Sequence, residues 1–313
     1  MYQEQRTVFY YCMSPVHMGA GTAVGAIDNP VQREVHTGHP CFAGSGIKGA
    51  VRHFCTDAWR GNGDLNAVFG PDTSASDYAG AVTFTDAQLV AFPVRTLKET
   101  FAYATCPTAL ARLKRCARDT TWSVPSVTRG KFLGDSSNRL VIDGKLILEA
   151  FEYDREAPNT DITAIAGWIA ENCLPNKGEF EYFRNKLRSD LVVLNDTDFA
   201  HFVQHSTIVE PHVRINNDTG TADDGGLFYT ENLPPESLLA GQILATVERR
   251  RADRGADDAG AALPRTAGQM LKILLAGSTD APGIDGKTIQ VGGDATTGRG
   301  LVTLQTFPRT GEN

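Results

Sequence analysis

The sequence predicts an α+β fold, with a ferredoxin-like sheet whose strands are separated by inserted helices. Strand-like and helix-like segments alternate along all 313 residues. Many neighbouring strand-like segments are joined by short turns, which favours antiparallel hairpins alongside β-α-β crossovers. With 41% hydrophobic residues, a chain of this length can bury a substantial core. One large domain or two small ones would satisfy these observations.

The N-terminal part contains a strand, a glycine-rich loop, a helix and a second strand region. Residues 7–13, TVFYYCM, form an apolar and aromatic run typical of a strand. The loop at 19–26 follows, and a helix is predicted for about 45–60, with Ser45 as its N-cap. Its apolar residues recur at helical spacing: Ile47, Val51, Phe54 and Ala58. Residues 80–97 alternate well enough for a strand pair or a bulged strand.

The rest of the chain interleaves helices and strands. The segment 107–118 begins with Pro and places Leu110 and Leu113 at helical spacing, which predicts a helix with a basic side. Further helices are predicted for 161–174, 179–189 and 266–277. Further strands are predicted for 145–153, 190–196, 208–216, 227–233, 242–249 and 301–307. The charged segment 248–262 is expected to form an exposed connection.

Composition excludes several classes of protein. No apolar run approaches the roughly 18 residues that span a bilayer, and the N-terminus lacks the apolar core of a signal peptide. A cytoplasmic protein without membrane contact is therefore expected. The six cysteines include no Cys-x-x-Cys pair, which argues against a zinc ribbon. The net charge of −7 argues mildly against nucleic acid, although 111–118 and 247–254 are locally basic.

Residues 25–54 hold the first candidate site. Lys48 and Arg52 lie four residues apart on the predicted helix, near the end where free N–H groups and the helix dipole favour a phosphate. An ordinary amphipathic helix with a solvated basic face would give the same pattern. Asp28 lies in an Asp-Asn-Pro string, which is typical of a turn. From these residues alone, both Asp28 and the basic face allow a structural interpretation.

A second candidate is the glycine-rich loop at 292–300, GGDATTGRG. Gly293 and Gly298 have the spacing of a phosphate-binding P-loop, but Arg299 and a strand-like segment follow where Lys, Ser or Thr and a helix are required. A nucleotide triphosphatase is therefore not favoured. The glycines allow close approach to a partner, and Arg299 offers a guanidinium for phosphate. A plain turn between strands is equally compatible.

Several strings resemble, in the same order, the RAMP superfamily of CRISPR proteins. They are SPVHMGAGTAVGAIDNPVQRE, GSGIKGAVR, FAYATCPTALARL, the region from DLVVLNDTDFAHFVQHST to LFYTENLP, and GGDATTGRGLV. Within that superfamily the chain resembles the Cas-seven-type backbone subunit of the type III-B (Cmr) effector complex. The segment 118–190 carries no confident match.

The resemblance implies a single RAMP domain over 1–313 with a modified RRM-like core. It places an inserted catalytic loop at about 19–43, a helical insertion at about 107–190 and a protruding thumb hairpin at about 196–226. Candidates for wedging between nucleotides are Phe199, Phe202 and Val213. Copies of such a subunit stack as a filament along crRNA beside other Cmr subunits, and the thumb interrupts the guide–target duplex.

The resemblance also implies roles for individual residues. Asp28 would cut the guide-paired target RNA with a divalent metal, Mg²⁺ or Mn²⁺, and would hold that metal. His17 would orient phosphate or assist proton transfer, and Glu231 would lie at the cleavage site. Residues expected to bind crRNA are Ser45, Lys48, Arg52, Gly293, Thr297, Gly298 and Arg299. The products would be a 5′-hydroxyl and a 2′,3′-cyclic phosphate.

Elementary chemistry is compatible with so small a site. RNA carries its own nucleophile, the 2′-hydroxyl, so the protein must align it, neutralise phosphate charge and help to move a proton. One carboxylate that holds Mg²⁺ through water can supply much of this. Two alternatives remain open: an RNA-binding structural subunit without nuclease activity, and a metal-independent guide-processing ribonuclease that uses His17.

Overall fold

The computed structural model describes nine stretches of the chain. They are residues 2–21, 25–60, 63–72, 78–118, 120–135, 138–157, 161–249, 263–278 and 281–308. Most of the connection predicted for 248–262 lies outside these ranges, as does part of the loop predicted for 19–26. Within the described stretches no helix is long and apolar enough to cross a membrane.

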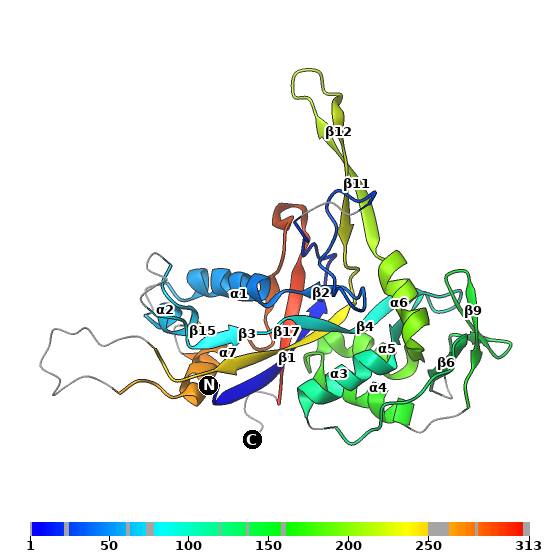
Figure 1. The fold of residues 1–313 in the computed structure, drawn as a ribbon, viewed down its shortest axis with the longest axis horizontal. Coiled ribbons are helices and arrows are strands. Elements are labelled where there is room, and N and C mark those ends of the chain that lie inside the picture. The colour runs from blue at the N-terminus through cyan, green and yellow to red at the C-terminus, as the bar shows by residue number, and fades with distance from the viewer. Residues whose placement is uncertain are drawn as a thin grey trace, which may run out of the picture.

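Four strands form the centre of the main sheet, in the order β17-β1-β13-β4, and each pairs antiparallel with its neighbour (Figure 1). They are β1 (Glu4–Cys12), β4 (Ala87–Arg95), β13 (Leu238–Ala245) and β17 (Leu301–Phe307). Helix α1 (Gly44–Ala58) lies between β1 and β4 in sequence, and α7 (Ala267–Leu275) lies between β13 and β17. Each helix therefore connects two parallel strands that have an antiparallel strand between them, as in the split β-α-β arrangement.

The sheet continues beyond β4 as β5-β10-β6-β9-β8-β7. These strands are β5 (Phe101–Thr105), β6 (Lys131–Gly134), β7 (Val141–Ile142), β8 (Lys145–Leu148), β9 (Phe151–Arg155) and β10 (Leu191–Leu194). Because β10 pairs parallel with β5, and β6 pairs parallel with β9, the sheet is mixed. The α+β class is confirmed, with a larger sheet than the sequence predicted.

Several short strands pair with members of this sheet or form a separate two-stranded sheet. The strands are β2 (Cys41–Phe42), β3 (Val82–Phe84), β14 (Gly277–Ser278), β15 (Ala281–Pro282) and β16 (Thr288–Gln290). Helix α2 (Asp64–Phe69) follows α1, and two 3-10 turns occur at Gly178–Phe180 and Ala295–Thr297.

Both faces of the central sheet are covered, which explains the continuous apolar run at the start of the chain. On β1, Val8 and Tyr10 join one hydrophobic cluster with α1 and α7. Phe9 and Tyr11 join a second cluster with α3 (Pro107–Ala117), α4 (Asp161–Asn172) and α5 (Glu181–Asp190). Successive side chains of a strand point to opposite faces. A strand covered on both faces therefore needs apolar residues at every position.

A two-stranded hairpin projects from this body (Figure 1). It consists of β11 (Ile208–Ile215) and β12 (Ala222–Asn232), and it is preceded by helix α6 (Asp196–His205). The sequence placed the thumb at 196–226 and suggested that Phe199 and Phe202 wedge between nucleotides. That suggestion is wrong, because both side chains are fully buried on α6 within the core. Val213, on β11, is 44% exposed.

Candidate functional site

The segment that carries Asp28 docks on the hairpin as a short third strand. Asn29 forms a parallel bridge with Thr230. The amide of Asn29 donates to the carbonyl of Tyr229 at 3.0 Å, and the amide of Glu231 donates to the carbonyl of Asn29 at 2.9 Å. Asp28 is exposed, and its Oδ2 accepts from the amide of Tyr229 at 2.7 Å. An exposed carboxylate is thereby fixed at the base of the hairpin.

Glu231 lies directly beneath this contact, but its carboxylate faces inward. The residue is only 2% exposed. Its Oε1 pairs with the guanidinium of Arg33 and accepts from the Thr207 hydroxyl at 2.7 Å, while its Oε2 accepts from the amide of Val31 at 3.0 Å. A buried carboxylate with this many donors is a structural anchor. Glu231 therefore holds the Asp28 segment in place, with its oxygens turned away from solvent.

His17 connects the hairpin base to the glycine-rich loop. Its Nδ1 lies 2.7 Å from the carbonyl oxygen of Glu231, and a carbonyl can only accept, so Nδ1 carries the proton. In the neutral ring Nε2 then keeps a free lone pair. A Cβ at Gly19 would lie 2.8 Å from that Nε2, so a side chain at position 19 would crowd it. The geometry makes His17 Nε2 a proton acceptor close to the Asp28 segment.

The glycine-rich loop packs against the backbone beside His17. The amide of Gly293 donates to the carbonyl of His17 at 2.8 Å. At Gly292, φ is +82° and a Cβ would lie 2.3 Å from the same carbonyl oxygen, so only glycine fits there. The loop leads directly into β17, which agrees with the exclusion of a P-loop. Thr297 and Gly298 are exposed at its outer turn.

The guanidinium of Arg299, at the end of this loop, forms an ion pair with a carboxylate. Its Nη2 lies 2.6 Å from Oε1 and 2.5 Å from Oε2 of Glu210, on the neighbouring strand β11. Both side chains are about three-quarters buried. In this state Arg299 ties the glycine-rich loop to the hairpin, and an RNA phosphate would have to share its guanidinium with Glu210.

Helix α1 forms a separate basic surface. Its N-cap is Ala43, so the prediction that Ser45 caps the helix is wrong. The first amide, of Gly44, donates instead to Asp86 Oδ1 at 2.7 Å, and Ser45 stands exposed in the first turn. Asp86 is distant in sequence, so no local pattern around the helix start indicates this partner. Ser45 remains a candidate for contact with RNA because of its exposure.

Lys48 and Arg52 lie on the same face of α1, as predicted. Partial burial lowers the pKa of Lys48, and the positive charges of Arg52 and Arg249 lower it further. Arg249 therefore belongs to this basic cluster. Arg52 also donates to the carbonyl of Gly70 at 2.8 Å and pairs with the exposed Asp72 at 2.7 Å.

The donor set at Asp28 fits a weakly held divalent ion. Among the described residues, no group of three or more His, Cys, Asp or Glu side chains gathers to form a complete metal cage. Mg²⁺ usually keeps several waters and binds one or two carboxylates together with substrate phosphates. A single exposed carboxylate that has spare oxygen lone pairs satisfies that requirement.

The structure thus brings some of the predicted residues together and separates others. Asp28, Glu231, His17, Gly293 and Arg299 meet around the hairpin base through the contacts described above. Ser45, Lys48 and Arg52 lie on α1 and form the separate basic surface described above. Sequence reasoning did not identify Arg33 or Arg249; the basic run at 247–254 was the one available signal for Arg249.

Comparisons with known proteins agree on one family. The model of the RAMP superfamily matches residues 9–303. The CRISPR system Cmr endoribonuclease Cmr4 of Pyrococcus furiosus is 31% identical over 301 residues, which cover 94% of this chain and 92% of that protein. The CRISPR system CMR subunit Cmr4 of Saccharolobus solfataricus is 26% identical over 257 residues, which cover 76% of this chain and 83% of that protein.

Solved structures show the same fold. The crystal structure of oligomeric Cmr4 from Pyrococcus furiosus matches with a TM-score of 0.71 and 25% identity, over 99% of both chains. A subunit in the cryo-EM structure of the type III-B Cmr-beta bound to cognate target RNA has a TM-score of 0.69 at 22% identity, over 97% of this chain and 98% of that one. The chain belongs to the RAMP superfamily.

Proposed function

We propose that this chain is the crRNA-binding backbone subunit of a type III-B effector complex and that Asp28 cleaves guide-paired target RNA. The main support is the docking of the Asp28 segment on β12, because it fixes an exposed carboxylate at the base of a projecting hairpin. The relatives named as a Cmr endoribonuclease and as oligomeric Cmr4 support the same proposal. Copies of the chain form a filament along the guide, beside other Cmr subunits.

The proposal divides the molecule into an RNA-holding core and a protruding thumb. Strands β1, β4, β13 and β17, with α1 and α7, form a modified RRM-like core, and β11–β12 is the thumb. Lys48, Arg52 and Arg249 hold guide phosphates, with Ser45 and the exposed turn at Thr297 and Gly298 beside the same backbone. Such contacts recognise phosphate and shape, while base pairing with the guide supplies sequence specificity.

Cleavage in this proposal uses the 2′-hydroxyl of the target as the nucleophile. Its oxygen forms a new bond to the adjacent phosphorus, the bond to the 5′-oxygen breaks, and the products are a 2′,3′-cyclic phosphate and a 5′-hydroxyl. His17 Nε2 accepts the 2′-hydroxyl proton, and the leaving 5′-oxygen takes a proton from solvent. Glu231 acts through Arg33 and Val31 by holding the Asp28 segment.

Asp28 is the residue of this chain that would hold the expected divalent ion, Mg²⁺ or Mn²⁺. A bound ion of this kind would neutralise phosphate charge and orient the scissile group. The backbone amide of Tyr229 binds one oxygen of Asp28, which fixes the direction of the carboxylate. Asp28 therefore needs no neighbouring carboxylate to be correctly placed.

The test compares Asp28→Asn with Asp218→Asn in a complex reconstituted with guide RNA. Asp28→Asn should reduce cutting of complementary RNA by about 100-fold or more, while guide binding is unchanged. Asp218→Asn, an exposed substitution at the far end of the hairpin, should leave cutting intact. Lys48→Ala/Arg52→Ala should instead weaken guide binding. Persistent cutting at regular intervals by Asp28→Asn would favour a subunit that only binds RNA.

The free lone pair on His17 Nε2 also keeps a second candidate open, a metal-independent guide-processing ribonuclease. Chelation with EDTA distinguishes the two. Activity that survives EDTA and disappears in His17→Ala would support the second candidate, whereas loss in EDTA and recovery with Mg²⁺ or Mn²⁺ would support the first.

A further inference from the structure

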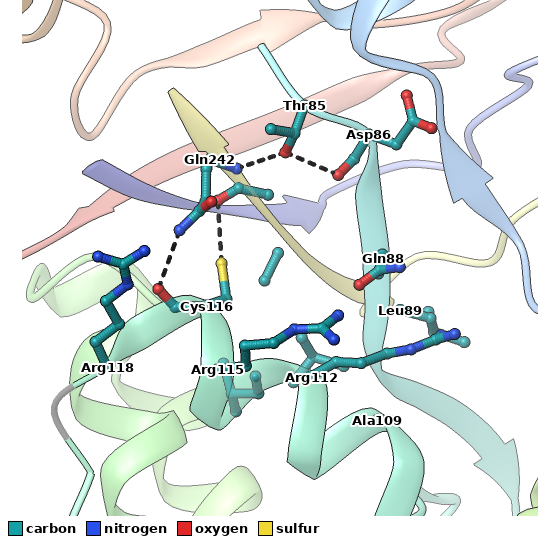
Figure 2. Close-up of a pocket in the computed structure, with 14 residues that line it drawn as sticks. Thr85, Asp86, Gln88, Leu89, Ala109, Arg112, Arg115, Cys116, Arg118 and Gln242 are labelled. Carbon is teal, nitrogen blue, oxygen red and sulfur yellow. Dashed lines mark hydrogen bonds between the residues drawn. The ribbon is translucent and has the colours of Figure 1, made fainter. Parts of the chain in front are cut away.

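A second basic site lies between helix α3 and strands β4 and β13 of the main sheet (Figure 2). This α3 groove has a volume of about 480 Å³. One wall is α3 with its C-cap, and the other is formed by β4, β13 and the turn at Thr85 and Asp86. Its floor is closed, because Leu89, Val90 and Leu113 are at most 2% exposed. A ligand would therefore contact the polar walls.

Three arginines line the groove, and two of them form no ion pair with a carboxylate in the part of the chain that the structure describes. Figure 2 shows Arg112, Arg115 and Arg118 extending from the α3 wall. Arg112 pairs with Glu34 at 2.8 Å. Arg118 donates to the amide oxygen of Gln5 at 2.7 Å, and this acceptor carries no charge. Arg115 is exposed, and it forms no ion pair with any of the residues that the structure describes.

The other polar groups of the walls are already engaged with one another. Gln242 donates from its side chain to the carbonyl of Cys116 at 3.4 Å and from its backbone to the Thr85 hydroxyl at 2.9 Å. Asp86 is the one acidic residue in the lining, and its Oδ1 accepts from Gly44. The remaining donors are therefore the guanidinium of Arg115 and the N–H groups of Arg118 that do not face Gln5, and guanidinium groups bind phosphate or carboxylate in a fork geometry.

The groove also borders the loop that carries Asp28. Arg112 bonds Glu34, and Gln88 donates to the other oxygen of the same carboxylate at 2.9 Å. Burial alone raises the pKa of the Glu34 carboxyl, but hydrogen bonds from Thr37 and Arg112 outweigh it and hold the pKa below its ordinary value. Glu34 thus stays charged, neutralises Arg112, and anchors the loop against the groove wall.

We propose that the α3 groove binds phosphates of a single-stranded RNA segment through Arg115 and Arg118. Three features favour RNA: the arginines lie on one helix and its C-cap, the remaining donors match phosphate oxygens, and the groove adjoins the loop proposed to cut RNA. The inference rests on the proposed RNA-binding function and adds a contact separate from the α1 surface. It also gives a role to the basic run at 111–118 in a chain of net charge −7.

The test measures RNA binding by the full-length chain with Arg115→Glu/Arg118→Glu. The matched control is Arg129→Glu/Arg188→Glu, which makes the same charge change at two surface arginines outside the groove. Affinity for a fluorescently labelled 30-nucleotide single-stranded RNA is measured by anisotropy at several salt concentrations. Circular dichroism verifies that both variants fold. RNA containing 4-thiouridine is cross-linked to the unmodified chain, and the cross-linked peptides are identified by mass spectrometry.

The groove variant should bind roughly tenfold more weakly than the control, and its salt slope should fall by about 1.4, since each phosphate contact on a single strand contributes about 0.7. Cross-links should fall within α3 or in the segment 85–88. Equal affinity for both variants, with no cross-link there, would overturn the inference. So would a groove variant that loses self-association but keeps RNA affinity, because the groove would then bind another copy.

These outcomes are independent of the proposed cleavage. A guide-loaded complex that carries Arg115→Glu/Arg118→Glu should need a higher concentration of target RNA for half-maximal cutting, because phosphate contacts are lost while Asp28 and its contacts are unchanged. If that complex cuts normally and RNA affinity is also unaffected, the groove assignment fails and the proposed function stands. If Asp28→Asn still cuts, the proposed function fails whatever the groove binds.

Discussion

The base and the tip of the β11–β12 hairpin are built in opposite ways. At the base, segments far apart in sequence converge: Asn29 pairs with Thr230, Arg33 with Glu231, and Arg299 with Glu210. At the tip, the bonds are local. The amide of Asn216 donates to Thr221 at 2.8 Å, and its side chain accepts from Asp218 and Thr219.

The contacts at the base and at the tip of the hairpin therefore have different roles. Contacts at the base fix where the hairpin stands relative to the sheet and to Asp28. Contacts at the tip define only the turn itself. Substitutions at the base should therefore alter stability and the placement of Asp28, whereas substitutions at the tip should affect neither.

The largest effect is expected for Glu231→Ala. Removal of this carboxylate leaves Arg33, the Val31 amide and the Thr207 hydroxyl without their buried acceptor. Breaking a buried ion pair from one side costs about 3 kcal/mol or more. Urea unfolding followed by circular dichroism measures the loss, with the exposed Glu152→Ala as control. A loss similar to that of Glu152→Ala would show that the base is not held by this pair.

A smaller effect is expected for Arg299→Ala. The pair with Glu210 is partly exposed, so its removal should cost about 1 kcal/mol. The change should appear as faster amide hydrogen exchange at 208–212, while exchange at 216–221 stays the same. Arg214→Ala, an exposed substitution near the tip-side end of β11, is the control. Equal acceleration at base and tip would mean that the hairpin opens as one unit.

The smallest effect is expected for Asp224→Ala at the tip. Asp224 is exposed, and such substitutions usually change stability by less than about 0.5 kcal/mol. Thermal unfolding measures this difference, and the cutting that we propose for Asp28 should also be unchanged. A marked loss of stability would mean that the tip is bound to the body of the protein, and the contrast between base and tip would fail.

Much of the fold was predictable because its signals are local. Pro107 begins α3 as expected, and the apolar residues of α1 face the core. The mixed extension β6–β9 was not predictable, since strand pairing depends on contacts between distant segments. The beginning of α6 was marked by Asn195, whose side chain accepts from the amides of Thr197 and Asp198. This N-cap marks the start of a helix, so it separates α6 from the hairpin within the segment 196–226.

The candidate site was predictable as a set of residues and less so as an arrangement. Asp28 and His17 were proposed from the strings that carry the family resemblance, and they stay predictions. The sequence could not indicate that Glu231 points inward, because its partner Arg33 lies 198 positions away. The cap of α1 was missed for the same reason, since Asp86 lies 42 positions from Gly44.

The short strand at Asn29 also bears on the solubility of the protein. A two-stranded ribbon exposes unpaired N–H and C=O groups along its outer edges, and such edges can recruit strands from other molecules and start aggregation. Asn29 occupies the edge of β12 at Thr230, next to the apolar and partly exposed Tyr229 and Phe228. The Asp28 segment therefore covers an aggregation-prone edge of β12. Variants that release the segment from β12 should precipitate more readily.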